Sequence, residues 1–208
     1  MEVASVNIGS RRSLSGRSFR GTTGIFKEPV AEPVTVSPLG LELDAVCNTR
    51  HHGGPDQAVY LYREEDYAWW SEQLGRSIGP GTFGDNLTLR GLPEPNLVIG
   101  SRLRLPDVLL EVSAPRIPCN TLAQRMEDAA FVKAFVEAER PGIYCRVIES
   151  GSVRVGDGFS FEPYAGEQVS TLDLFRANYR KLSFDDLRRY LSVPIDVRTR
   201  SKFEAKLK

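Results

Sequence analysis

The chain has 208 residues, 41% of them hydrophobic and 26% charged, as expected for one medium-sized globular domain or one domain with a small appendage. Its 27 basic and 27 acidic residues cancel, so net charge gives no reason to expect nucleic acid or a membrane surface as a partner. No apolar run approaches the roughly 18 residues of a membrane span. Three cysteines and no apolar signal segment lead us to expect free thiols and a cytoplasmic location.

The N-terminal part is predicted to contain short strands and one helix. A loop rich in Ser, Gly and Arg covers residues 10–24 and is expected to be a hairpin loop. Residues 64–74 predict a helix, because the first turn is acidic, Tyr67 and Trp70 share one face, and Gly75 can end it. Strands are predicted at residues 3–8, 24–30, 34–36 and 58–62.

Two segments resemble each other, residues 98–105 and 154–161. Each places an apolar residue, a glycine and a small polar residue before alternating apolar positions, which predicts two similar turns into strands. Further strands are predicted at residues 108–112 and 143–148, and helices at 121–126 and 131–138. Strands and helices do not alternate regularly, so the predicted class is mostly β (α+β) and not a doubly wound sheet.

The last part of the chain is predicted to be helical. Ser170-x-x-Asp173 and Ser183-x-x-Asp186 both fit the start signal of a helix, and a third helix is expected at residues 198–207. Three short helices bury little surface alone, so we expect them to pack on the main domain or on a second subunit, as in a homodimer. The predicted division is a main domain of residues 1–163 and a helical extension of residues 164–208.

Cys119 lies where a cysteine could carry chemistry. It follows Arg116-Ile117-Pro118, between a predicted strand and a predicted helix start. Backbone N–H groups at a helix start, with Arg116 nearby, favour a thiolate. Such a thiolate is either a nucleophile or a soft metal ligand. The alternative is a buried, inert thiol, since free cysteine is commonly buried.

The segment His51-His52-Gly53-Gly54 is a second candidate. The two histidines are the only ones in the chain, so a three-histidine zinc site is excluded. On an extended backbone they would point in opposite directions. The two glycines permit a close approach of backbone to a ligand, although an ordinary glycine turn would use them equally well.

Three further polar residues remain open to two interpretations. Asn86, in a glycine-containing loop, can hold a ligand through donor and acceptor or form an Asx-type turn. Arg146 faces either solvent or, if turned inward, an anion or a carboxylate. Lys27 has the same ambiguity, with the solvated position favoured.

Taken in order, these segments resemble the MOSC family (molybdenum cofactor sulfurase C-terminal domain), most closely its stand-alone YiiM-like branch with a C-terminal three-helix extension. The resemblance implies a MOSC-type β-barrel with peripheral helices. The segments that carry it are Lys27-Glu28-Pro29-Val30, His52-Gly53-Gly54-Pro55-Asp56, Phe83-Gly84-Asp85-Asn86-Leu87, Ile99-Gly100-Ser101, Pro115-Arg116-Ile117-Pro118-Cys119 and Gly142-Ile143-Tyr144-Cys145-Arg146-Val147.

The resemblance also implies a function. Its cofactor is a molybdopterin that carries molybdenum, with Cys119 as the thiolate ligand to the metal and the catalytic residue. The activity implied is reduction of N-hydroxylated compounds, such as 6-N-hydroxylaminopurine, to amines. Electrons would come from a separate redox protein, because the chain has no cysteine set for an iron–sulfur cluster. The implied cofactor-binding residues are Arg116, Arg146 and Lys27 for the pterin phosphate and ring, and His52, Gly53, Gly54 and Asn86 for its rim.

The sequence departs from the family pattern near these segments. Leu43-Asp44 stands where the family usually has Gly-Asp, and Asp85 replaces the usual Glu before Asn86.

Two other functions remain open. One alternative is a binding module that carries molybdopterin or a sulfur species without turnover. The other is a hydrolase or transferase whose nucleophile, Cys119, pairs with one of the two histidines.

Overall fold

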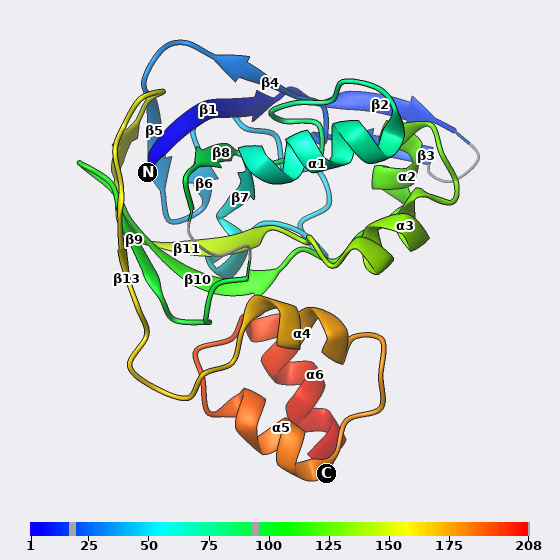
Figure 1. The fold of residues 1–208 in the computed structure, drawn as a ribbon, viewed down its shortest axis with the longest axis vertical. Helices are drawn as coiled ribbons and strands as arrows, with labels where there is room; N and C mark the ends of the chain where they lie inside the picture. The colour runs from blue at the N-terminus through cyan, green and yellow to red at the C-terminus, as the bar shows by residue number, and fades with distance from the viewer. Residues whose placement is uncertain (17–19, 93–95, 208) are drawn as a thin grey trace.

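The computed structural model describes residues 1–16, 20–92 and 96–207, which form a twisted β structure with helices at its rim and below it (Figure 1). The strands are β1 (Glu2–Gly9), β2 (Arg12–Ser15), β3 (Arg20–Thr23), β4 (Lys27–Val30), β5 (Val34–Ser37), β6 (Gly40–Leu41), β7 (Val59–Arg63), β8 (Leu87–Arg90), β9 (Arg102–Arg104), β10 (Leu109–Pro115), β11 (Ile143–Glu149), β12 (Gly151–Val153) and β13 (Ser160–Glu162). The helices are η1 (Pro55–Gln57, a 3-10 turn), α1 (Glu64–Leu74), α2 (Asn120–Met126), α3 (Phe131–Ala138), α4 (Thr171–Ala177), α5 (Phe184–Leu191) and α6 (Val197–Leu207).

An eight-stranded sheet dominates the fold, in the order β13-β9-β10-β11-β7-β8-β1-β4. Its only parallel pair in the described residues is β7–β8, joined by α1 as a crossover helix. The sheet does not close into the expected barrel, because no ladder joins β13 to β4 in the described chain. The bridge Glu2↔Gly158 and backbone hydrogen bonds of Met1 and Val3 with residues 156–159 tie the start of β1 to the turn before β13. The mixed α+β class is confirmed, and the barrel is replaced by an open curved sheet.

The two similar glycine turns are confirmed. Gly100 and Gly156 both adopt a positive φ, 88° and 87°, a conformation that glycine reaches without a steric penalty. Each turn leads into a short strand, and the two strands, β9 and β13, pair with each other, with Leu103 opposite Phe161. The repeated sequence pattern therefore builds one edge of the large sheet.

Two apolar clusters fill the interior. The larger cluster lies between the sheets and the C-terminal helices, and β10, buried along its whole length, runs through it. The smaller cluster is aromatic and packs α1, α2 and α3 against one end of the sheet. Trp70 stacks on Phe135 with ring centroids 5.9 Å apart, and Phe83 contacts both rings. The smaller cluster contains Tyr60, Tyr62, Tyr67, Trp70, Phe83, Leu122, Met126, Phe131 and Phe135.

The C-terminal helices α4, α5 and α6 lie together beneath the sheet (Figure 1). Both predicted start signals form complete capping boxes, at Ser170 for α4 and at Ser183 for α5. Buried side chains of these helices, among them Leu174 and Phe203, belong to the same apolar cluster as Val112 of β10. The helices therefore pack on the main domain of their own chain. The boundary between residues 163 and 164 stays a prediction.

Most predicted elements have the expected type. Helices α1 and α3 span the predicted residues, and α6 begins one residue earlier than expected. The predicted hairpin loop of residues 10–24 is shorter than expected, because most of it forms the paired strands β2 and β3. Residues 17–19 lie outside the described chain. None of the described helices combines the length and the apolar character that crossing a bilayer requires.

Candidate active site

A pocket of about 780 Å³, part of it open to solvent, lies beside the start of α2. It brings together most residues that the sequence singled out: Lys27, His52, Gly53, Asn86, Arg116 and Cys119. Gly54 and Arg146 do not line it. The other lining residues are Thr22, Thr23, Gly24, Ile25, Asp44, Ala45, Val46, Cys47, Asn48, Gln57, Ala58, Tyr60, Phe83, Gly84, Thr121 and Tyr144.

Cys119 is the N-cap residue of α2, with an extended backbone. Pro118 disfavours the helical conformation at Ile117, the residue before it, and the helix starts after the extended Cys119. Burial acts to raise the pKa of the thiol. A hydrogen bond with His52, the charge of Arg116 and the backbone N–H of Leu122 act in the opposite direction and lower the pKa from 9.0 to about 6. The thiol is therefore mostly ionised at neutral pH and faces the pocket.

Arg116 is a buried cation without a carboxylate partner in the described residues. Its residue is 4% exposed, and its guanidinium carbon lies 5.8 Å from the ring centroid of Tyr60 and 5.6 Å from that of Phe135. The buried Nη1 atom has no hydrogen-bond partner. Burying an unpaired charge costs several kcal/mol unless an anion compensates it. The Cys119 thiolate supplies part of that compensation, and a donor remains for an anionic ligand.

Lys27 and Asn86 line the pocket but are already engaged. The Lys27 ammonium pairs with the carboxylate of Asp44, and both side chains are largely buried. Asn86 donates to the same carboxylate at 2.9 Å and accepts from the N–H of Tyr60 at 3.1 Å. Lys27 is therefore neutralised by Asp44 and is not the solvated lysine that the sequence favoured. Asn86 fixes the wall of the pocket.

Leu43, the residue before this carboxylate, is one of the departures from the family pattern and has a strained backbone. Leu43 adopts a φ of 65°, although its side chain is 85% exposed and gains nothing from packing. The family glycine would adopt this conformation without strain, whereas leucine pays roughly 1–2 kcal/mol for it. The backbone still turns as required, so that Asp44 reaches Lys27.

The histidine turn directs its two imidazoles to different cavities. His52 lines the pocket beside Cys119, while His51 lines a second cavity between the sheet and the C-terminal helices. The opposite directions agree with the prediction, although a turn and not a strand produces them. Gly53 and Gly54 have φ values of 68° and 81°. A Cβ atom at Gly53 would lie 2.8 Å from Val46, so the turn requires glycine there.

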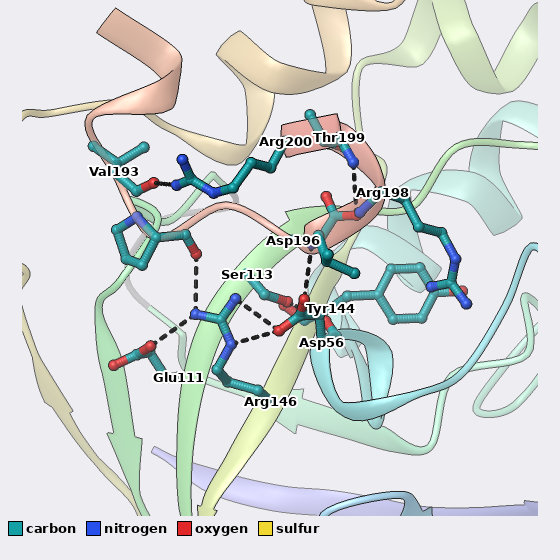
Figure 2. A network of polar contacts seen from close by, with 12 residues as sticks. Asp56, Glu111, Ser113, Tyr144, Arg146, Val193, Asp196, Arg198, Thr199 and Arg200 are labelled. Atoms are coloured by element: carbon teal, nitrogen blue, oxygen red, sulfur yellow. Dashed lines mark hydrogen bonds and ion pairs between the residues drawn. The ribbon is translucent and has the colours of Figure 1, made fainter. Parts of the chain in front are cut away.

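The position of Arg146 corrects the prediction that this residue binds the pterin. Its guanidinium lies outside the pocket, between the carboxylates of Asp56 and Glu111 (Figure 2). It also donates to the carbonyl oxygen of Pro194 at 3.0 Å. The sequence indicated that an inward arginine needs an anion or a carboxylate, and the structure supplies two carboxylates from distant segments. Arg146 therefore joins the sheet to η1 and to the segment before α6.

Several polar lining residues were not singled out from the sequence, among them Asp44, Cys47, Tyr60 and Tyr144. Asp44 was noted only as part of a departure, and Cys47 only in the cysteine count. Tyr60 and Tyr144 lie on β7 and β11, with ring centroids 5.0 Å apart, and both line the pocket. The alternation along β11 predicted a shared face for Tyr144 and Arg146, but only Tyr144 lines the pocket. All four depend on contacts between distant segments.

Comparison with known proteins identifies the family. A MOSC domain model matches residues 48–160, more than half of the chain, so the chain belongs to the MOSC domain family. It is 34% identical over 177 residues to the Bacillus subtilis protein YflK, a match covering 85% of this chain and 80% of YflK. A protein named reductase from Gibberella moniliformis is 32% identical over 149 residues, which are 69% of this chain and 26% of that protein.

A solved structure extends the likeness to the whole chain. The crystal structure of YiiM from Geobacillus stearothermophilus superimposes with a TM-score of 0.82 at 26% identity, covering 100% of this chain and 99% of that one. The resemblance to YiiM is thereby confirmed, and the helical extension is compatible with it.

Proposed function

We propose that this chain binds a molybdenum cofactor in the pocket and uses it to reduce N-hydroxylated compounds. The observation that carries the proposal is the pair formed by an ionised thiol, Cys119, and a buried unpaired cation, Arg116, facing one pocket. The first is a soft metal ligand, and the second attracts an anionic group such as a phosphate. The similarity to a protein named reductase is consistent with this function.

The residues present fit a metal that arrives with ligands of its own. Within residues 1–16, 20–92 and 96–207, no group of three His, Cys, Asp or Glu side chains could hold a bare metal ion. One thiolate can complete the coordination of a metal already chelated by an organic cofactor. Arg116 would bind the anionic part of that cofactor, since Lys27 is compensated by Asp44. Tyr60 and Tyr144 offer ring surface beside it.

The proposed reaction gives a specific role to each of three pocket residues. Reduction of R–NHOH to R–NH₂ and water consumes two electrons and two protons, and a bound molybdenum cofactor supplies the two-electron step. Cys119 holds the cofactor, and Arg116 orients it. His52 lies against Cys119 and lines the pocket, where its imidazole could exchange a proton with a bound substrate.

The electrons are proposed to come from a separate redox protein. Of the three cysteines, Cys145 is fully buried in the apolar cluster, so no set of thiols in the described chain could bind an iron–sulfur cluster. A donor protein or a chemical reductant must therefore deliver them to the pocket.

Metal analysis tests the proposal. The chain would be produced in a host that makes the cofactor, and molybdenum per chain would be measured in the wild type, Cys119→Ser and Cys47→Ser. Cys47 is the matched control, because it lines the same pocket on a different segment. We expect molybdenum in the wild type and Cys47→Ser, and none in Cys119→Ser. The proposal fails if the wild type carries none while a known molybdenum protein made beside it is loaded.

A turnover assay distinguishes a reductase from a non-catalytic cofactor carrier. The loaded protein would be supplied with 6-N-hydroxylaminopurine and reduced methyl viologen, and formation of the amine would be followed. Amine formation supports the reductase. Molybdenum held through Cys119 without amine formation would instead identify a non-catalytic cofactor carrier.

The contact between Cys119 and His52 favours one other candidate function, a cysteine nucleophile activated by an imidazole. No hydrogen bond in the described residues orients the His52 imidazole from its far side, which a triad would need. Hydrolase or transferase activity in metal-free protein, abolished by alkylation of Cys119, would establish this alternative.

A further inference from the structure

The wall of the pocket that carries His52 is held by few bonds of its own. Within residues 48–54, the N–H groups of His51 and His52 donate to the carbonyl oxygen of Asn48, at 3.2 and 2.9 Å. Gly53 and Gly54 follow, and residues 48–51 are exposed. Glycine pairs have high conformational freedom, so this segment needs outside contacts to keep one conformation.

Arg198 of α6 supplies these contacts. Its guanidinium donates to the carbonyl oxygen of Gly53 at 3.0 Å, of Thr49 at 3.1 Å and of His52 at 3.4 Å. In the described chain it is the only side chain that donates to the carbonyl oxygens of residues 48–54. One cation thus binds three carbonyl groups on both sides of the His52 side chain. Hydrogen bonds from a charged donor are stronger than those between neutral groups.

The start of α6 is fixed so that Arg198 keeps this position. The N–H of Asp196 donates to the carbonyl oxygen of Ser113 in β10, at 3.2 Å. The N–H of Val197 donates to the Asp56 carboxylate at 2.8 Å, and Arg146 binds the other oxygen of the same carboxylate at 2.9 Å. Figure 2 shows Ser113, Asp56 and Arg146 beside the first turn of α6. The helix start is therefore connected to the rest of the domain through Ser113, Asp56 and Arg146, residues that do not line the pocket.

We propose that Arg198 is a positioning residue, through which the C-terminal helices hold the His52 turn against Cys119. The extension is then a working part of the site, although its helices contribute no residue to the pocket lining. This inference goes beyond the proposed function, because it concerns the shape of the pocket whatever group the pocket binds.

Arg200 provides a matched control on the same helix. It is also half-buried, and it donates to the carbonyl oxygens of Leu191 at 3.1 Å and Val193 at 2.8 Å. These acceptors belong to the extension itself. Removing Arg200 therefore weakens the packing of α6 without touching the His52 turn.

Hydrogen exchange of the metal-free full-length protein tests the proposal. We expect Arg198→Ala to speed exchange in peptides covering residues 48–57 at least tenfold, because the turn loses its three outside hydrogen bonds. Arg198→Lys keeps one charged donor and should give an intermediate rate. Arg200→Ala should leave these peptides at the wild-type rate. Unchanged exchange in Arg198→Ala, or equal acceleration in Arg200→Ala, overturns the proposal.

A second measurement relates the turn to the function of the pocket. Molybdenum per chain should fall at least threefold in Arg198→Ala, recover partly in Arg198→Lys and stay unchanged in Arg200→Ala. Loss of metal from Arg198→Ala and Arg200→Ala alike would show a general stability effect and contradict the positioning role. Absence of molybdenum from the wild type would reject the proposed cofactor, while the exchange rates would still decide the role of Arg198.

Discussion

Replacing His52 by alanine is expected to raise the pKa of Cys119. His52 forms the hydrogen bond that, with Arg116, keeps this thiol ionised against the effect of burial. With a pKa of about 6, about nine-tenths of the thiol is ionised at pH 7. A hydrogen bond to a charged group contributes about 1.5–3 kcal/mol, which corresponds to about one to two pH units. The ionised fraction at pH 7 should therefore fall to about one half or one tenth.

Alkylation kinetics measure this change directly. Metal-free protein in a Cys47→Ser background leaves Cys119 as the reactive thiol, because Cys145 is fully buried and burial raises its pKa. The rate with iodoacetamide, measured from pH 4.5 to 9.5, should rise through a midpoint near pH 6, since only the thiolate reacts. In His52→Ala the midpoint should move upward and the rate at pH 7 should fall two- to tenfold.

His51→Ala is the control, because this neighbouring imidazole lines the second cavity. It should keep the wild-type midpoint. A wild-type midpoint near 9, or a midpoint that His52→Ala leaves in place, would refute the explanation given for the ionised thiol.

Three further changes should alter stability, each measured as the free energy of unfolding in urea. Leu43→Gly should stabilise by about 1 kcal/mol, because it removes a left-handed leucine with an exposed side chain, and a loss of stability would contradict this strain. Arg146→Ala should destabilise by about 2 kcal/mol, because Asp56 and Glu111 lose a half-buried partner, and an unchanged free energy of unfolding would contradict this role. Ser170→Ala should cost about 1 kcal/mol through loss of the capping box, and an unchanged value would show that the cap contributes nothing.

Local signals account for the parts of the fold that the sequence predicted well. The acidic first turn and Gly75, which adopts a φ of 60°, define α1. The Ser–Asp pairs define the starts of α4 and α5, because capping involves residues only three apart. The open edge of the large sheet was not predictable in this way. Closure depends on whether β13 meets β4, which are joined by no local pattern.

The difference between local signals and contacts of distant segments also applies to the site. Arg116 and Cys119 are three residues apart, and the strand end and helix start between them bring both side chains to one pocket. The orientation of Arg146 was decided by carboxylates 35 and 90 positions away. Asp44, which neutralises Lys27, also comes from another segment. The charge of each residue is known from the sequence, but the pairing of charges depends on which distant segments the fold brings into contact.

The shared interior of the sheet and the C-terminal helices restricts how this protein could change during evolution. Leu174 and Phe203 belong to the same apolar cluster as Val112 of the sheet. A descendant that lost its last 45 residues would expose apolar surface unless polar substitutions arose on the sheet at the same time. Family members without the three helices should therefore carry hydrophilic side chains on that face, and the sheet residues alone would reveal whether a relative ever had the extra segment.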